Sequence, residues 1–312
     1  MICEYAIEPT TLPLTWQRFI YVIEKFGFDR GRLISCLPTE WLREVADAVE
    51  DSDFTELQRM KADEKLLWAK KYALCGSGRP LNEAIGDWNA NAISAQEAGQ
   101  VKAVVAAENP TDHAGVVRFD DLTDDHELFK APNSWEVPRT SNGITSAVTP
   151  FITESRAIFL VDPYFHGGTF GPNYTDPLAS MLDIISRYGV RKVRFQIHFK
   201  SIDQNPNLDH YEANSHALFG GVIPDGLSVE LYEWKEKQNG NQFHDRHLLT
   251  ERGGVTLGAG FCSTDNAHNL GVTLMSIEDS VKKIRRFFPG STEYDPVGKG
   301  LKVLSDGTTQ RI

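Results

Sequence analysis

Residues from about 141 to 261 alternate between amphipathic helical segments and short apolar strands, and this alternation limits the fold more than any other feature of the chain. Ile144 and Val148 recur at helical spacing, and the apolar run RAIFLVDPYF follows them as a buried strand. Asp176 and the proline after it begin a second helix, and VRFQIHF and LSVELYEW are further strands, with a helix around residues 211–218 between them. This order predicts a layered α/β domain with ligands at the strand ends.

The stretch FHDRHLLTERGGVTLGAGF, residues 243–261, carries the most reactive combination of side chains. Alternation along the predicted strand places His244 and Arg246 on one face. An imidazole can attack phosphorus, and a guanidinium two residues away can hold two phosphate oxygens. Glu251 stands at the far end of the strand, where it could orient an imidazole of the same or of a facing copy. The next strand ends in a glycine-rich segment at Gly258 and Gly260, where the backbone can approach a ligand closely.

The spacing of these residues resembles the motif of the phospholipase D superfamily, which reads His-x-Lys, four residues, Asp, six residues, Gly-Ser-x-Asn. The departures from that pattern are Arg246 for lysine, Glu251 for aspartate, Ala259 for serine and Phe261 for asparagine. His244, Asp245 and Arg246, followed by a glycine-rich hairpin, more closely resemble the single-motif branch typified by the C-terminal domain of eukaryotic MIT-domain proteins. That branch uses the phospholipase D fold to bind membrane phosphoinositides rather than for known hydrolysis. The resemblance covers roughly residues 140–290 and implies a phospholipase D-like α/β domain there.

Further candidates for substrate binding stand at predicted strand ends. Three of them follow the first buried strand: Asp162, Tyr164 and His166. A capped turn is the alternative interpretation of that segment. His198 and Lys200 repeat the His-x-Lys spacing, but Asn205 stands where a second motif needs a carboxylate. We therefore interpret His198 as a strand-end residue packed near the site, and His247, on the opposite strand face from His244, as a packed histidine.

The first 130 residues are interpreted as a mainly helical domain that precedes the α/β domain of residues 131–312. Trp16, Phe19, Ile20 and Ile23 fall at i, i+3, i+4 and i+7, the spacing of one helix face. The other expected elements are helices over residues 41–49 and 54–74 and around Trp88, with short strands at residues 101–107 and 116–119.

Acidic residues are concentrated in the N-terminal part. Residues 1–140 hold 15 Lys and Arg against 24 Asp and Glu, a net charge of −9, whereas residues 141–312 carry −2. A field of that sign repels polyanions, so contact with nucleic acid requires a local basic groove or a partner. The acidic domain is expected to recruit a protein partner.

Other function classes leave no trace in the sequence. No apolar run approaches the roughly 20 residues that span a bilayer, and the opening residues lack the pattern of a secretory signal, so a cytoplasmic location is the default expectation. The four cysteines have no metal-binding spacing and are expected to be free thiols. Neither a cofactor nor a metal is predicted.

Two functions remain open. The first is a metal-independent phosphodiesterase of phospholipase D-like type, acting on DNA or RNA, in which a homodimer brings together two copies of His244. In that case the acidic domain would regulate or dock the enzyme within a bacterial system such as phage defence. The second is a catalytically silent module that binds a lipid headgroup, a nucleotide, a nucleic acid or a protein partner. The homodimer separates them in part, because only the enzyme requires it.

Overall fold

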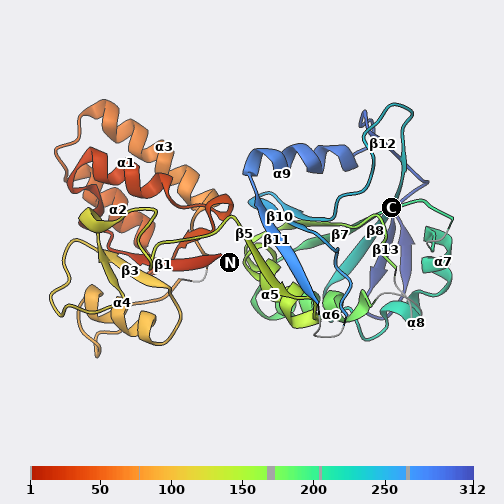
Figure 1. The fold of residues 1–312 in the computed structure, drawn as a ribbon, viewed down its shortest axis with the longest axis horizontal. Helices are drawn as coiled ribbons and strands as arrows, with labels where there is room; N and C mark the ends of the chain where they lie inside the picture. The colour runs from red at the N-terminus through yellow and green to blue at the C-terminus, as the bar shows by residue number, and fades with distance from the viewer. Residues whose placement is uncertain (1, 77, 167–172, 204–205, 265–267) are drawn as a thin grey trace. The chain divides into compact units, whose positions relative to one another are not determined.

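The computed structural model describes residues 2–76, 78–166, 173–203, 206–264 and 268–312. The chain divides into two compact units, Met1–Asn133 and Ser134–Ile312, where the sequence prediction had placed the break between residues 130 and 131. Both units combine helices with a β-sheet, so the protein is of the α/β type (Figure 1). In the described parts of the chain, no helix is both long and apolar enough to cross a membrane.

Within residues 2–76 and 78–133, four parallel strands form a sheet in the order β2-β1-β3-β4. They are β1 (Cys3–Ile7), β2 (Arg32–Ile34), β3 (Ala103–Ala106) and β4 (Val116–Arg118). The helices are α1 (Trp16–Glu24), α2 (Trp41–Glu50), α3 (Glu56–Tyr72) and α4 (Trp88–Glu97), with 3-10 turns η1 (Leu12–Leu14), η2 (Phe28–Arg30) and η3 (Phe119–Asp121). The prediction of a mainly helical domain missed β1 and β2, because such short strands show no clear alternation.

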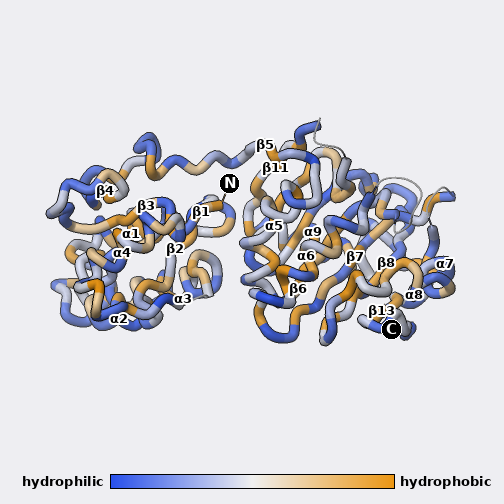
Figure 2. Tube along the Cα trace, turned by 90° about the horizontal axis from the view of Figure 1, so that it is seen from below, coloured by the Kyte–Doolittle hydropathy of each residue, from blue (hydrophilic) through white to orange (hydrophobic). Residues whose placement is uncertain are grey.

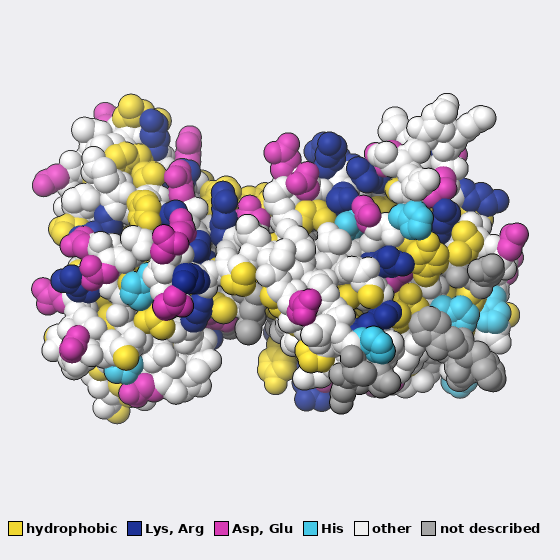
Figure 3. Space-filling view, viewed as in Figure 1, with side chains coloured by type: hydrophobic (Ala, Val, Ile, Leu, Met, Phe, Trp, Pro, Cys, Tyr) yellow, Lys and Arg dark blue, Asp and Glu magenta, His cyan; other side chains and the backbone are white. Residues whose placement is uncertain are grey.

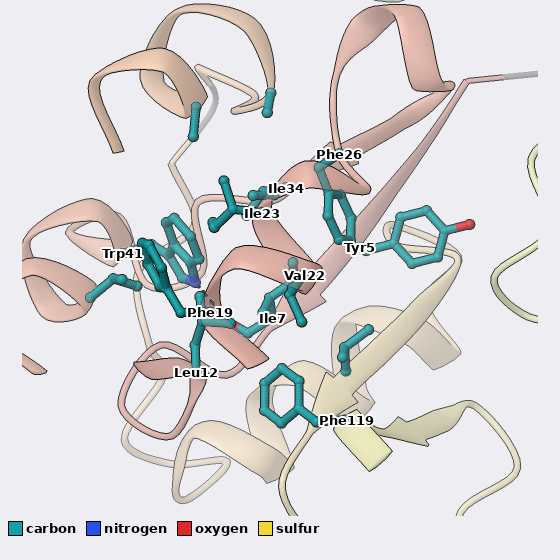
Figure 4. Close-up of a cluster of buried hydrophobic side chains, with 14 of the residues drawn as sticks. Tyr5, Ile7, Leu12, Phe19, Val22, Ile23, Phe26, Ile34, Trp41 and Phe119 are labelled. Carbon is teal, nitrogen blue, oxygen red and sulfur yellow. Dashed lines mark hydrogen bonds between the residues drawn. The ribbon is translucent and has the colours of Figure 1, made fainter. Parts of the chain in front are cut away.

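The core of this unit lies between the sheet and the apolar faces of α1 to α3 (Figure 4). Helix α1 begins at the side chain of Thr15, which accepts a hydrogen bond from the Arg18 N–H, and it buries Phe19 completely. The indole of Trp41, also fully buried, donates to the Ile7 carbonyl at 2.7 Å and so joins α2 to the central strand.

In the described part of the C-terminal unit, ten strands form one mixed sheet, in the order β14-β13-β8-β7-β6-β9-β10-β11-β5 with β12 paired to β8. Strands β6, β7 and β8 are parallel, and their neighbours run antiparallel to them. The strands are β5 (Ser134–Pro138), β6 (Ala157–Val161), β7 (Arg194–Lys200), β8 (Ser228–Glu236), β9 (His247–Thr250), β10 (Gly253–Leu257), β11 (Asn269–Met275), β12 (Tyr294–Pro296), β13 (Leu301–Leu304) and β14 (Thr309–Arg311).

Helices cover both faces of this sheet, with α5 and α6 on one side and α9 on the other (Figure 1). The helices are α5 (Ser141–Glu154), α6 (Thr175–Tyr188), α7 (Leu208–Ala213), α8 (Ser215–Phe219) and α9 (Ile277–Ile284), followed by η4 (Arg285–Phe287). Apolar residues are frequent along the central strands of this unit (Figure 2), where helices cover both faces of the sheet. Beneath α9 and η4 lies an aromatic cluster that includes Phe159, Trp234, Phe243, Phe287 and Tyr294.

Candidate functional site

Strand pairing brings three distant segments together at the carboxyl end of β6. Strand β9 is antiparallel to β6 and pairs His247 with Val161, so the residues before β9 lie beside those that follow β6. Strand β10 returns along β9, and the Leu257 N–H donates to the Arg246 carbonyl at 3.0 Å. The segment at residues 162–166, the segment at residues 244–246 and the loop at residues 258–262 therefore meet at one edge of the sheet.

His244, Arg246 and Tyr164, three of the candidate residues from the sequence, lie together at this edge. The Tyr164 hydroxyl lies 3.3 Å from Nδ1 of His244, and the Arg246 guanidinium lies 5.0 Å from the centre of the Tyr164 ring. His244 is exposed and Arg246 is half-buried, so both side chains are open to a ligand. An imidazole and a guanidinium on one aromatic ring can contact the same phosphate group.

Asp162 stabilises this arrangement from the protein interior. Its side chain is fully buried and accepts hydrogen bonds from the Tyr164 N–H at 3.0 Å and from the Phe261 N–H at 3.1 Å. Burial raises the pKa of Asp162, while those two backbone hydrogen bonds, the charge of Arg246 and the Tyr174 hydroxyl act to lower it. Asp162 therefore positions the Tyr164 segment and the loop after β10, and it is not itself exposed to a ligand.

Gly260, rather than Gly258, is the glycine that the site requires. Gly260 has φ of +81°, and a Cβ on it would lie 2.5 Å from Oδ2 of Asp162 and 3.2 Å from the Arg246 side chain. Gly258 is exposed, and a Cβ there would meet nothing closer than the Gly271 carbonyl at 3.7 Å. The sequence indicated a glycine-rich strand end at Gly258 and Gly260, and the close approach occurs at Gly260.

Lys200 lies close to the site through a carboxylate that the sequence analysis missed. Its Nζ is 2.7 Å from Oε1 of Glu236, which also accepts the Phe243 N–H at 2.6 Å. Burial acts to raise the pKa of Glu236, but the hydrogen bonds from Lys200 and Phe243 and the charges of Lys200 and His244 lower it overall. The parallel pairing of β7 with β8 places Lys200 opposite Trp234, and a register prediction of that pairing would have revealed Glu236.

The structure does not bring Glu251 into this group. Its carboxylate accepts hydrogen bonds from the backbone N–H groups of Arg156 and Ala157, at 2.7 and 3.2 Å. Arg156 precedes β6 and Ala157 begins it, at the opposite end of β9 from His244. Glu251 therefore fastens the start of β6, and the expectation that it orients the His244 imidazole of the same copy is wrong.

His198 is also outside the site. It is 1% exposed, and its ring stacks at 5.1 Å on Tyr232 and at 5.3 Å on Phe159. The Trp234 indole donates to its Nδ1 at 3.0 Å, and its Nε2 lies 3.3 Å from the Gln196 side-chain oxygen. Burial, and then the charge of Arg194, lowers the pKa of His198 to about 3. The imidazole is therefore neutral and packs as part of the aromatic cluster.

Two other histidines have different surroundings from that of His244. His247 is buried, with Nδ1 at 3.0 Å from Thr256, and burial followed by the charge of Lys283 lowers its pKa to about 4. His166 is half-buried, and among the described residues neither a hydrogen bond nor a ring contact joins it to His244. The glycine-rich residues 167–172 and Asn205 lie outside the described residues.

In the described ranges, no group of three or more His, Cys, Asp or Glu side chains is placed to hold a metal ion. The chemistry that this site can offer comes from one exposed imidazole, one guanidinium and one phenol.

Comparison with known proteins adds little to this geometry. No known protein family and no curated protein matches the chain. A solved structure of TrmBL2, an archaeal chromatin protein described as showing a novel mode of DNA binding, is similar at 14% identity and a TM-score of 0.27. The similarity covers 51% of this chain and 52% of that one, so this chain spans about half the length of that protein. A similarity at that level does not establish a shared fold.

Proposed function

We propose that the C-terminal unit is a phospholipase D-like domain and a metal-independent phosphodiesterase, which acts on DNA or RNA as a homodimer. The observation that carries this proposal is the placement of exposed His244 and half-buried Arg246 around the single ring of Tyr164. An open imidazole beside a fixed guanidinium is the minimum that histidine-based phosphodiester chemistry requires.

The proposed reaction has two steps. With the proton on Nδ1 facing the Tyr164 hydroxyl, Nε2 of His244 attacks phosphorus, a P–N bond forms and the bond to the leaving oxygen breaks. His244 of a second copy donates the proton to that oxygen, and then takes a proton from the water that cleaves the P–N bond. Arg246 binds the phosphate oxygens and offsets their charge in both steps. A twofold axis would place the two imidazoles on opposite sides of the phosphorus.

The second candidate, a silent module that binds a phosphate-bearing ligand, is favoured by the histidines of a single copy. His198 and His247 are buried and neutral, so neither can protonate a leaving group. A monomer would keep His244 and Arg246 as a phosphate pocket without turnover. The ligand would then be a lipid headgroup, a nucleotide or a nucleic acid.

Hydrolysis in the presence of EDTA tests the enzyme. The substrates are bis-p-nitrophenyl phosphate and labelled single- and double-stranded DNA and RNA, and the variants are His244→Ala and Arg246→Ala. The matched control is His210→Ala, which removes another exposed histidine, on α7. We expect cleavage in EDTA by the wild type and by the His210 variant, and none by the other two.

Binding measurements distinguish the remaining outcomes. If no variant cleaves but phosphate-bearing oligonucleotides or headgroups bind the wild type and not His244→Ala, the silent module is the function. If neither cleavage nor binding depends on His244 or Arg246, both proposals are wrong.

A further inference from the structure

A pocket of about 750 Å³ lies in the N-terminal unit, and its lining residues are far in sequence from those of the proposed phosphodiester site. The end of α1, the turn at η2 and the middle of α3 enclose it, and Ile23, fully buried, lies at its base. Aromatic side chains line it from two helices, with Tyr21 from α1 and Trp68 from α3. Trp68 is half-buried, so part of its ring is open to a bound group.

The most unusual group in this pocket is the carboxylate of Asp29. Its Oδ1 is buried and has no hydrogen-bond partner among the described residues. Burial raises the pKa of Asp29, and the charge of Arg30 and a backbone hydrogen bond oppose that only in part. Gly27 makes room for the carboxylate, because a Cβ at that position, where φ is +150°, would lie 2.6 Å from Oδ1. A buried acceptor without a donor is costly. The Asp29 side chain is half-buried and lines the pocket, so a donor that enters the pocket and turns the carboxylate toward itself offsets that cost.

The cationic side chains around the pocket are already engaged, except for one. Lys65 pairs with Glu24 at 2.7 Å, and Lys25 pairs with Asp124. Arg32, 7% exposed, donates to the Phe129 carbonyl and also pairs with Asp124 at 3.1 Å. The exception among the lining residues is Arg30, which is exposed to solvent. The lining holds four cationic and four anionic side chains, so its formal charge is zero. Which ligand charge the pocket prefers therefore depends on where each group lies, and the unpartnered acceptor of the lining is Asp29.

Two larger features favour a cationic occupant. The carboxyl end of α1 borders the pocket through Glu24, and the partial negative charge at that end of a helix attracts cations. The unit as a whole, residues 1–133, carries 14 Lys and Arg against 23 Asp and Glu, a net charge of −9. On the face seen in Figure 3, acidic and cationic side chains lie intermixed over this unit, so the excess negative charge is spread rather than confined to one patch.

We infer that this pocket binds the guanidinium of an arginine presented by a partner protein, with Asp29 as the acceptor and Trp68 as the stacking surface. Guanidinium is planar, donates two parallel hydrogen bonds to a carboxylate and stacks on aromatic faces, whereas an ammonium group does only part of this. The acidic unit draws basic segments toward it before contact. This inference does not depend on the phosphodiester site of the C-terminal unit.

Calorimetric titration of the full chain tests the inference, with a capped Gly-Arg repeat peptide as the probe. A version with citrulline keeps the length of the peptide and removes the charge. A version with lysine keeps the charge and removes the planar fork of donors. We expect the arginine peptide to bind, the lysine peptide to bind more weakly and the citrulline peptide not to bind. Asp29→Asn and Trp68→Ala should each weaken binding of the arginine peptide roughly tenfold or more.

The matched control is Asp63→Asn, which removes the same charge from an exposed position of α3 that does not line the pocket. Binding by this variant should match that of the wild type. Asp29→Asn is also expected to melt no lower than the wild type, because it neutralises a half-buried carboxylate whose Oδ1 lacks a hydrogen-bond partner among the described residues. A lower affinity in a variant of equal or higher stability points to a ligand group and not to a folding defect.

Several results would overturn the inference. One is equal binding of the arginine and citrulline peptides, and another is unchanged binding by Asp29→Asn. Binding of adenosine monophosphate that depends on Trp68 and Arg30, without binding of the arginine peptide, would make the pocket a nucleotide site and exclude the arginine proposal.

Discussion

Two regions of the C-terminal unit each have a histidine two residues before a lysine or arginine, but one histidine is buried and the other is exposed. His198, two residues before Lys200, is 1% exposed, stacks on aromatic rings and receives a hydrogen bond from the Trp234 indole. His244, two residues before Arg246, is exposed and contacts the Tyr164 hydroxyl through Nδ1. The spacing therefore does not decide the chemistry. An imidazole whose two nitrogens are both engaged in the core cannot attack a substrate, and an exposed one can.

Replacing each histidine by alanine should give the largest contrast between the two regions. His198→Ala leaves a cavity among stacked rings and removes the acceptor of the buried Trp234 indole, so we expect a loss of about 3–5 kcal/mol of unfolding free energy. His244→Ala removes an exposed side chain and should change stability by less than about 0.5 kcal/mol. Urea unfolding measures both, and equal losses would show that the two environments are not as different as described.

This contrast also shows how far the sequence could go. The apolar runs predicted β6, β7 and β8, because buried parallel strands are recognisable one at a time. The edge strand β5, with the sequence SWEVP, was not among the predicted strands, because only its pairing with β11 makes it a strand.

For the proposed site, the sequence identified residues that a local pattern marks and missed a contact that only strand pairing creates. His244 and Arg246 were found by their spacing, and Tyr164 by its place after a strand. Glu236 was missed, because its role depends on a contact with Lys200 from another strand. Long-range packing decides such contacts, and no local pattern records it.

The next largest effect is expected from the glycine that holds the His244 region in place. Gly260→Ala forces a side chain into a backbone with φ of +81° and within 2.5 Å of the Asp162 carboxylate, so we expect a loss of about 2–3 kcal/mol and displacement of Arg246. Gly258→Ala is the matched control and should cost less than about 0.5 kcal/mol. Thermal unfolding and phosphate binding would follow both variants, and a tolerated Gly260→Ala would contradict the proposed role of Asp162.

The pH dependence of the unfolding free energy tests whether His198 is as buried as the structure indicates. Its pKa is lowered to about 3 in the folded protein from 6.5 in the unfolded chain, so the unfolded chain binds the extra proton first as the pH falls. The stability contributed by this histidine is present above pH 6.5 and is lost as the pH falls toward 3, by about 1.4 kcal/mol per pH unit within that window.

Urea titrations at several pH values in that window should show the loss in the wild type. His198→Gln should have a shallower slope, because one titrating group is removed, and comparing the two chains cancels the contributions of groups such as Asp162. Identical slopes would mean that the imidazole of His198 is not kept neutral by burial.

The smallest effect is expected at Glu251. This residue belongs to the site by its motif spacing, whereas its contacts in the structure are elsewhere. Glu251 lies five residues beyond Arg246, roughly 17 Å along an extended strand, and its carboxylate holds the N–H groups of Arg156 and Ala157. Glu251→Gln keeps one acceptor and loses the charge, so it should cost about 1 kcal/mol of stability and leave phosphate binding by His244 unchanged. Affinity that falls as steeply in Glu251→Gln as in His244→Ala would mean that the carboxylate reaches a site, which in this arrangement only a second copy could supply.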